Sequence, residues 1–222
     1  MSIAELAIGT YGAIQKSVEL EALLDIVAKE KPHTLVEIGT RSGGTLYALC
    51  QVAPDDALII SIDSCWETYA LAAQLDNDNE FYTSFCKPTQ ELRFLHADTH
   101  DDSTFQYLKN LLAGDPIDFL FIDGDHTYRG VKKDWLMYSP LVSDGGMVAF
   151  HDIATHTDKE VSCHVDEFWT ELKESGDYRI KEIYHDSRKD GELMYEVYSV
   201  PDYDQVWGGI GIVYIEKGGE TI

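Results

Sequence analysis

Four short runs of apolar residues limit the folds that this chain can adopt. They occupy residues 35–38, 58–62, 117–122 and 147–150. Because the runs are almost continuously apolar rather than alternating, each is typical of a strand buried on both faces, as in a parallel sheet. Residues 92–95 form one more strand candidate.

The segments between these runs have helical length and pattern. Apolar residues recur at every fourth position across residues 13–30, which predicts an amphipathic helix. Further helices are expected over residues 44–53, 101–113 and 127–139. Strands that alternate with helices in this way predict a doubly wound α/β fold.

The first strand runs into a glycine-containing turn. The pattern is Glu37-x-Gly39-x-x-x-Gly43-Gly44. Glycines let a backbone pass close to a ligand, and Asp63, which ends the next strand, could accept both hydroxyls of a ribose. The dinucleotide pattern would have another glycine where Arg41 stands. A nucleoside-cofactor site is therefore predicted, and a plain strand-to-helix turn is the alternative.

A second acid, Asp98, follows the strand candidate at 92–95. In a doubly wound sheet this strand end lies beside the one that carries Asp63, so both acids are expected to face one crevice. Alternatively, this stretch only begins a helix, because the polar residues at 99 and 101–103 are all suitable N-caps.

Two further strands end in acids and histidines. Residues 117–122 lead into Asp123, Asp125 and His126, and residues 147–150 lead into the pair His151 and Asp152. Adjacent parallel strands bring their carboxyl ends to one edge of the sheet, where ligands bind. Such matching ends are hard to explain as packing, so a functional site is favoured over solvated strand ends.

These segments together resemble the class I S-adenosylmethionine-dependent methyltransferases, whose first motif has the acid-x-Gly-x-x-x-Gly form. Residues 118–125 and 145–152 resemble the caffeoyl-CoA and catechol O-methyltransferases. Residues 123–128, 150–153 and 207–214 resemble the cephalosporin-hydroxylase-like and macrocin-type O-methyltransferases.

The resemblance extends over most of the chain from about residue 12 and is weakest at residues 64–91 and 154–206. It implies a Rossmann-like methyltransferase fold with a mostly parallel seven-stranded sheet and helices on both faces. Residues 1–222 would form one domain, with the two weak segments on the capping or acceptor side. An ordinary helix pair is the alternative for residues 64–91.

S-adenosylmethionine is the cofactor that the resemblance implies. Asp63 would hold its ribose, and the Asp98 loop would lie at the adenine edge. The full set of implied cofactor contacts is Glu37, Gly39, Thr40, Ser42, Gly43, Asp63, Ser64, Asp98, Thr99 and Asp123.

A divalent metal is also implied, at Asp123, His151 and Asp152. The related enzymes have Asp at the position of His151 and Asn at that of Asp152. The ion is expected to be Mg or Mn, although an imidazole ligand suits Mn, Fe or Zn better than Mg. Methyl transfer needs an aligned and deprotonated acceptor hydroxyl, and His126 and His151 are the candidate catalytic bases. If His151 binds the metal, His126 is the better candidate.

Composition narrows the partners. The chain has 17 Lys and Arg against 40 Asp and Glu, a net charge of −23, which argues against binding to nucleic acid. Its four cysteines lack metal-site or disulfide spacing, so reduced thiols are expected. No apolar stretch approaches the roughly 18 residues of a membrane span, and the N-terminus lacks a basic region, which predicts a cytoplasmic protein that does not bind membranes. The sequence is compatible with a homo-oligomer and does not fix the oligomeric state.

The expected function is therefore metal-assisted methyl transfer from S-adenosylmethionine to a hydroxyl of a small sugar or natural-product acceptor. A Rossmann-type oxidoreductase would share the sheet and the ribose acid, and a non-catalytic homologue would keep the cofactor fold for interaction. Fold alone does not decide between them.

Overall fold

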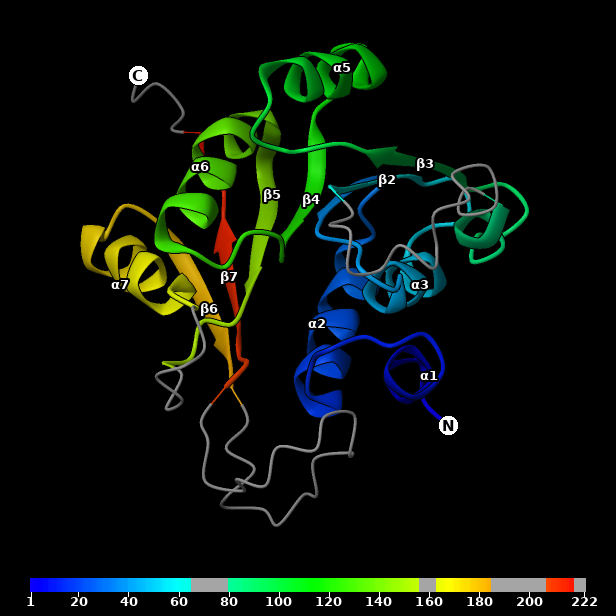
Figure 1. Ribbon diagram of the computed structural model, residues 1–222, viewed down its shortest axis with the longest axis horizontal. Helices are drawn as coiled ribbons and strands as arrows, with labels where there is room; N and C mark the ends of the chain where they lie inside the picture. The colour runs from blue at the N-terminus through cyan, green and yellow to red at the C-terminus, as the bar shows by residue number, and fades with distance from the viewer. Residues whose placement is uncertain (65–79, 156–162, 185–206, 218–222) are drawn as a thin grey trace.

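The computed structural model describes residues 1–64, 80–155, 163–184 and 207–217. A seven-stranded sheet of order β3-β2-β1-β4-β5-β7-β6 lies between two groups of helices (Figure 1). The expected doubly wound, mostly parallel α/β fold is confirmed. The single domain over residues 1–222 stays a prediction, because much of the expected capping segments at 64–91 and 154–206 falls outside the described residues.

All five strands expected from apolar runs are present, and two more complete the sheet. The strands are β1 Thr34–Ile38, β2 Leu58–Asp63, β3 Glu91–His96, β4 Ile117–Ile122, β5 Val142–His151, β6 Arg179–Ile183 and β7 Ile210–Tyr214. Only β7 among them runs antiparallel, and it pairs with both β5 and β6. β5 begins before the apolar run at 147–150 from which it was predicted. Its early residues 143–145 are polar or glycine and partly exposed, so the apolar pattern did not include them.

Four of the described helices lie where the sequence predicted them, one with a shifted start, and the first and last described helices were not predicted. They are α1 Ile3–Gly9, α2 Ser17–Glu30, α3 Gly44–Val52, α5 Asp102–Leu112, α6 Tyr128–Tyr138 and α7 Val165–Ser175. The helix expected from residue 13 begins instead at Ser17, because the backbone of its N-cap residue Lys16 is extended, with a φ of −73° and a ψ of 135°. None of the described helices is both long and apolar enough to cross a membrane.

Alternate strand residues bury against opposite helical layers. Leu35 packs in a core with α1, α2 and α3, whereas its neighbour Val36 packs in a second core with α5, α6 and α7. Figure 1 shows the two groups of helices on opposite sides of the sheet. Burial on both faces accounts for the continuous apolar runs.

The register brings the carboxyl ends of the central strands together. Ile38 of β1 is opposite Ile122 of β4, and the Asp123 N–H donates to the Ile38 carbonyl at 2.9 Å. The Gly39 N–H donates to the Ile62 carbonyl of β2, also at 2.9 Å. The loops that carry the sequence motifs therefore start side by side.

Candidate functional site

Gly39 begins the turn after β1, and the structure leaves room there for no other residue. Its φ is 91°, and a Cβ atom would lie 2.0 Å from the carbonyl oxygen of Asp123. Gly39 thus allows the loops after β1 and β4 to touch. Packing therefore requires a glycine here, in addition to the close approach of a ligand that the sequence suggested.

Asp63 organises the same turn from the end of β2. Its Oδ2 accepts hydrogen bonds from the N–H groups of Thr40 at 2.7 Å and Arg41 at 2.6 Å. Arg41 has a φ of 48°, a left-handed conformation that is unfavourable for a side chain with a Cβ. The carboxylate therefore stabilises a strained turn, in addition to any contact with a ligand.

Glu37 lies beneath the turn and is fully buried. Ser61 Oγ donates to Glu37 Oε2 at 2.5 Å, and the hydroxyls of Ser61 and Thr40 are 2.5 Å apart. Burial raises the pKa of Glu37 to about 8; the Ser61 hydrogen bond opposes this shift, and the nearby Asp123 and Asp63 add to it. Glu37 is thus a buried support of the turn.

Gln15 connects the turn before α2 to both motif loops. Its Nε2 donates to Asp123 Oδ2 at 2.8 Å, and its Oε1 accepts from Thr45 Oγ1 at 3.0 Å. Only 6% of Gln15 is exposed. The amide therefore fixes one carboxylate oxygen of Asp123 relative to the first turn of α3.

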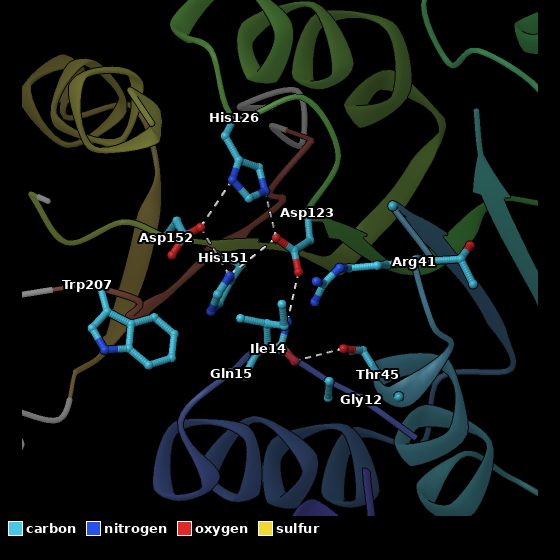
Figure 2. Close-up of a pocket in the computed structure, with 14 residues that line it drawn as sticks. Gly12, Ile14, Gln15, Arg41, Thr45, Asp123, His126, His151, Asp152 and Trp207 are labelled. Atoms are coloured by element: carbon cyan, nitrogen blue, oxygen red, sulfur yellow. Dashed lines mark hydrogen bonds and ion pairs between the residues drawn. The ribbon is translucent and has the colours of Figure 1, made fainter. Parts of the chain in front are cut away.

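Two carboxylates and two imidazoles form a compact cluster at the ends of β4 and β5 (Figure 2). His126 lies between the acids, with Nε2 at 3.2 Å from Asp123 Oδ1 and Nδ1 at 3.3 Å from Asp152 Oδ2. His151 Nδ1 faces the same two oxygens, at 3.3 Å from Asp123 and 3.5 Å from Asp152. The structure brings these four residues together, at the edge of the sheet where the sequence placed both strand ends; their roles stay a prediction.

The electrostatics of the cluster follow from this mutual pairing. Burial disfavours the charged form of His126, but its hydrogen bonds to Asp123 and Cys163 and the charge of Asp152 raise its pKa to about 11. Burial likewise opposes ionisation of Asp123, yet the pKa of Asp123 is lowered because His151 and His126 face it. The two acids therefore require a cation between them, either imidazolium or a metal ion.

The ligand atoms of Asp123, His151 and Asp152 all lie within 4.8 Å of one another. Asp152 has a φ of 61°, a strained value for a residue other than glycine. Strained backbone is typical of positions where a side chain must point in one direction. One nitrogen and two carboxylate oxygens that converge at a buried position fit a divalent transition metal.

The cluster and the glycine turn line one cavity of about 240 Å³. Of the residues predicted from sequence, Gly39, Thr40, Asp123, His126, His151 and Asp152 line it. Glu37, Ser42, Gly43, Asp63, Ser64, Asp98 and Thr99 are not among its lining residues. Figure 2 shows Arg41 and Trp207 at opposite ends of this cavity, with the cluster between them.

The predicted residues outside the cavity have other contacts. Ser42 lies against Gly12, and Gly43 faces Tyr82 and Phe85. The Ser64 carbonyl lies 3.2 Å from His96 Nε2.

The Asp98 loop is shaped by bonds of its own. Asp98 Oδ1 accepts from the His100 N–H at 2.8 Å, and the Thr99 carbonyl accepts from Tyr138 Oη at 2.7 Å. Asp101 is the N-cap of α5, but its side chain makes no capping hydrogen bond. Asp98 therefore shapes a local turn, and one of the N-cap candidates after it, Asp101, begins the helix as the alternative interpretation expected.

Sequence reasoning did not assign a role to several residues that the fold brings to the site. Gln15, Thr45 and Trp207 line the cavity, and Cys163, in the segment before α7, places its sulfur within 4.8 Å of a His126 ring nitrogen. These residues belong to loops and helix starts outside the strand-end motifs. Only Trp207 had a signal, because it opens the segment 207–214 that resembles the terminal strand of related enzymes.

The sheet order and the strand-end cluster define a Rossmann-like α/β fold of the methyltransferase type. A family model described as a methyltransferase domain matches residues 36–153, more than half of the chain. The chain therefore belongs to this methyltransferase family.

A curated relative and two solved structures extend the comparison. Uncharacterized protein R132 of Acanthamoeba polyphaga mimivirus is 34% identical over 119 residues, which is 54% of this chain and 51% of that protein. The chain thus matches about half the length of this relative.

Two solved O-methyltransferases share the fold over nearly the whole chain. TomG from Streptomyces achromogenes, in complex with SAM, has a TM-score of 0.56 at 15% identity, over 96% of this chain and 87% of that one. The Bacillus cereus O-methyltransferase, in complex with SAH, has a TM-score of 0.59 at 14% identity, over 97% and 91%. At these identities the likeness establishes the fold.

Proposed function

We propose that this chain transfers a methyl group from S-adenosylmethionine to a hydroxyl group of a small molecule. The observation that carries the proposal is a single cavity lined by both the glycine turn and the Asp123–His126–His151–Asp152 cluster. A cofactor bound at the turn would lie next to side chains that can act as bases or metal ligands. This arrangement is expected where the cofactor reacts with a second substrate.

The cofactor belongs on the side of the cavity formed by the turn. The N-terminus of α3 supplies N–H groups near Gly44 and Thr45, which suit the carboxylate of a methionine moiety. A cavity of about 240 Å³ holds part of such a cofactor, so its nucleoside end would extend outward toward Asp63 and the Asp98 loop. The printed names of TomG and the Bacillus cereus enzyme, with SAM and SAH bound, support this choice of cofactor.

The acceptor belongs at the opposite end, against Trp207 (Figure 2). The Trp207 ring lies 5.3 Å from Lys16 Nζ, and the Gly209 N–H donates to the buried Glu19 Oε2 at 2.9 Å. The first contact is with the indole itself, and the second anchors the segment that follows it. The flat apolar face of the indole, next to the polar side chains of the cluster, suits an acceptor ring that carries hydroxyls, such as a sugar or a phenol.

Asp123, His151 and Asp152 would hold a divalent ion. When bound, the ion supplies Lewis acidity that orients an acceptor hydroxyl and lowers its pKa, and S-adenosylmethionine supplies an electrophilic methyl group. Gln15 keeps one oxygen of Asp123 in place, so that the other faces the cluster. Asp123 and Asp152 orient the His126 ring from either side. A cation held by these two carboxylates would offset the charge that raises the His126 pKa, and the neutral imidazole would then accept the hydroxyl proton.

Two alternatives remain to be separated from this proposal. A Rossmann-type oxidoreductase would use a nicotinamide cofactor, and a non-catalytic homologue would bind a cofactor without turnover. The buried His–Asp cluster favours catalysis, because ionisable groups are costly to bury even when paired, and strongly shifted pKa values are concentrated at functional sites.

Transfer of a labelled methyl group tests the proposal. We expect label to pass from S-adenosylmethionine to one or more members of a panel of sugars and phenols with adjacent hydroxyls, with Mn or Mg present and not with chelator. His126→Gln should lower kcat by at least about 100-fold, the usual effect of losing a general base. His33→Gln, at an exposed turn far from the cavity, is the control. Label transfer at full rate in chelator would refute the metal assignment, and hydride transfer from a nicotinamide cofactor would refute the function.

A further inference from the structure

Cys163 belongs to the cluster but has no part in the proposed methyl transfer. It directly precedes His164, the N-cap of α7, and is 6% exposed. The His164 N–H donates to the His126 carbonyl at 2.8 Å, which fixes this segment against the β4 loop. The Cys163 sulfur lies within 4.8 Å of a ring nitrogen of His126. A buried thiol is thus held beside an imidazole and a carboxylate.

The ligand atoms of His126, Asp152 and Cys163 lie within 4.8 Å of one another. In a tetrahedral zinc site, Zn–S is about 2.3 Å and Zn–N about 2.0 Å, so that two ligand atoms are about 3.5 Å apart. Side-chain rotations that bring the atoms closer by about 1 Å would complete such a site.

The donor set differs from that of the neighbouring Asp123–His151–Asp152 group. Sulfur and nitrogen select thiophilic ions such as Zn²⁺, whereas oxygen-rich sets accept Mn or Mg. The two groups share Asp152 and therefore compete for it. Three protein ligands leave a fourth position open, as in zinc sites that bind water or a small ligand.

We propose that His126, Asp152 and Cys163 form a second, thiolate-containing metal site that binds Zn²⁺ or a related thiophilic ion. Binding deprotonates the thiol, and its proton passes to solvent. An ion at this position occupies the His126 imidazole and draws Asp152 away from the other group. Zn²⁺ therefore inhibits methyl transfer that Mn or Mg supports, a consequence that rests on the proposed function. Zinc binding itself does not.

Cobalt absorption tests the site without any turnover. Co²⁺ added to the metal-free full-length protein should give a thiolate-to-cobalt charge-transfer band in the near ultraviolet, which Zn²⁺ then abolishes by displacement. Cys163→Ala should remove the band, and Cys86→Ala, at a partly buried cysteine outside the cluster, should retain it. His126→Gln should weaken Co²⁺ binding by at least about tenfold.

X-ray absorption of the zinc-loaded wild-type protein provides a readout that does not depend on any variant's folding. We expect one sulfur at about 2.3 Å in the first shell of the metal. A shell of only nitrogen and oxygen, no charge-transfer band, or a band that persists in folded Cys163→Ala would each overturn the site. A sulfur ligand in a protein that shows no methyl transfer would leave this site standing and count only against the proposed function.

Discussion

Replacing Asp63 should weaken both the fold and cofactor binding. In Asp63→Ala the N–H groups of Thr40 and Arg41 lose the carboxylate that accepts them at 2.7 and 2.6 Å. A hydrogen bond to a charged group contributes about 1.5–3 kcal/mol, and water replaces part of it at this partly exposed position. Allowing for that, we expect a loss of about 2 kcal/mol in the free energy of unfolding.

For a chain of this length, a loss of that size lowers Tm by about 4–8 °C, measured by calorimetry or circular dichroism. Asp63→Asn keeps an oxygen that can accept both N–H groups, so its Tm should fall by less than half as much. Asp25→Asn, which removes the same charge from an exposed position of α2, is the control for net charge.

Cofactor affinity separates the two roles of Asp63. If the carboxylate also accepts ribose hydroxyls, both variants should bind S-adenosylhomocysteine at least about tenfold more weakly, since the lost charged acceptor contributes about 1–3 kcal/mol. If Asp63→Asn binds S-adenosylhomocysteine as tightly as the wild type does, the role of Asp63 is only to support the turn. Unchanged Tm and unchanged affinity in Asp63→Ala would refute the reasoning altogether.

Three further changes have expected outcomes. Gly44→Ala would place a Cβ 2.3 Å from the Ala13 nitrogen, so its free energy of unfolding should fall by about 1–3 kcal/mol, whereas Gly9→Ala, with open space around it, should change Tm little; equal melting of the two would contradict this. The buried carboxylate of Asp134, with Oδ1 at 3.2 Å from His100 Nε2, raises the pKa of His100, so this pair stabilises the fold fully below about pH 6.5 and less as pH rises through the raised pKa. The difference in unfolding free energy between wild type and His100→Gln should therefore shrink with rising pH, and a constant difference would count against the pair. Trp207→Ala should raise the acceptor KM about tenfold, or about 1.4 kcal/mol, with cofactor affinity unchanged; a fall in cofactor affinity instead would place the indole on the wrong side of the cavity.

The strand-end residues could be predicted from sequence because sheet geometry restricts them. Parallel strands that are apolar on both faces must end at one edge, so Asp123, His151 and Asp152 follow from pattern alone. The same rule placed Asp63 next to the glycine turn. It did not reveal that Asp63 accepts hydrogen bonds from the turn itself, because that depends on the left-handed conformation of Arg41.

Other parts of the site depend on packing between distant segments. Gln15 reaches Asp123 from the turn before α2, and Cys163 reaches His126 from the start of α7. No local period or spacing encodes such contacts, since they arise only when helices settle on the sheet. Glu37 shows the opposite case: its motif position indicated a cofactor contact, but the residue is fully buried and hydrogen-bonded to Ser61 beneath the turn.

Titration calorimetry with S-adenosylhomocysteine tests the central claim most directly, because it requires neither the acceptor nor the metal. We expect saturable binding of one molecule per chain and a rise in Tm with ligand concentration. Binding of a nicotinamide dinucleotide, with no heat or Tm shift from S-adenosylhomocysteine, would contradict the account.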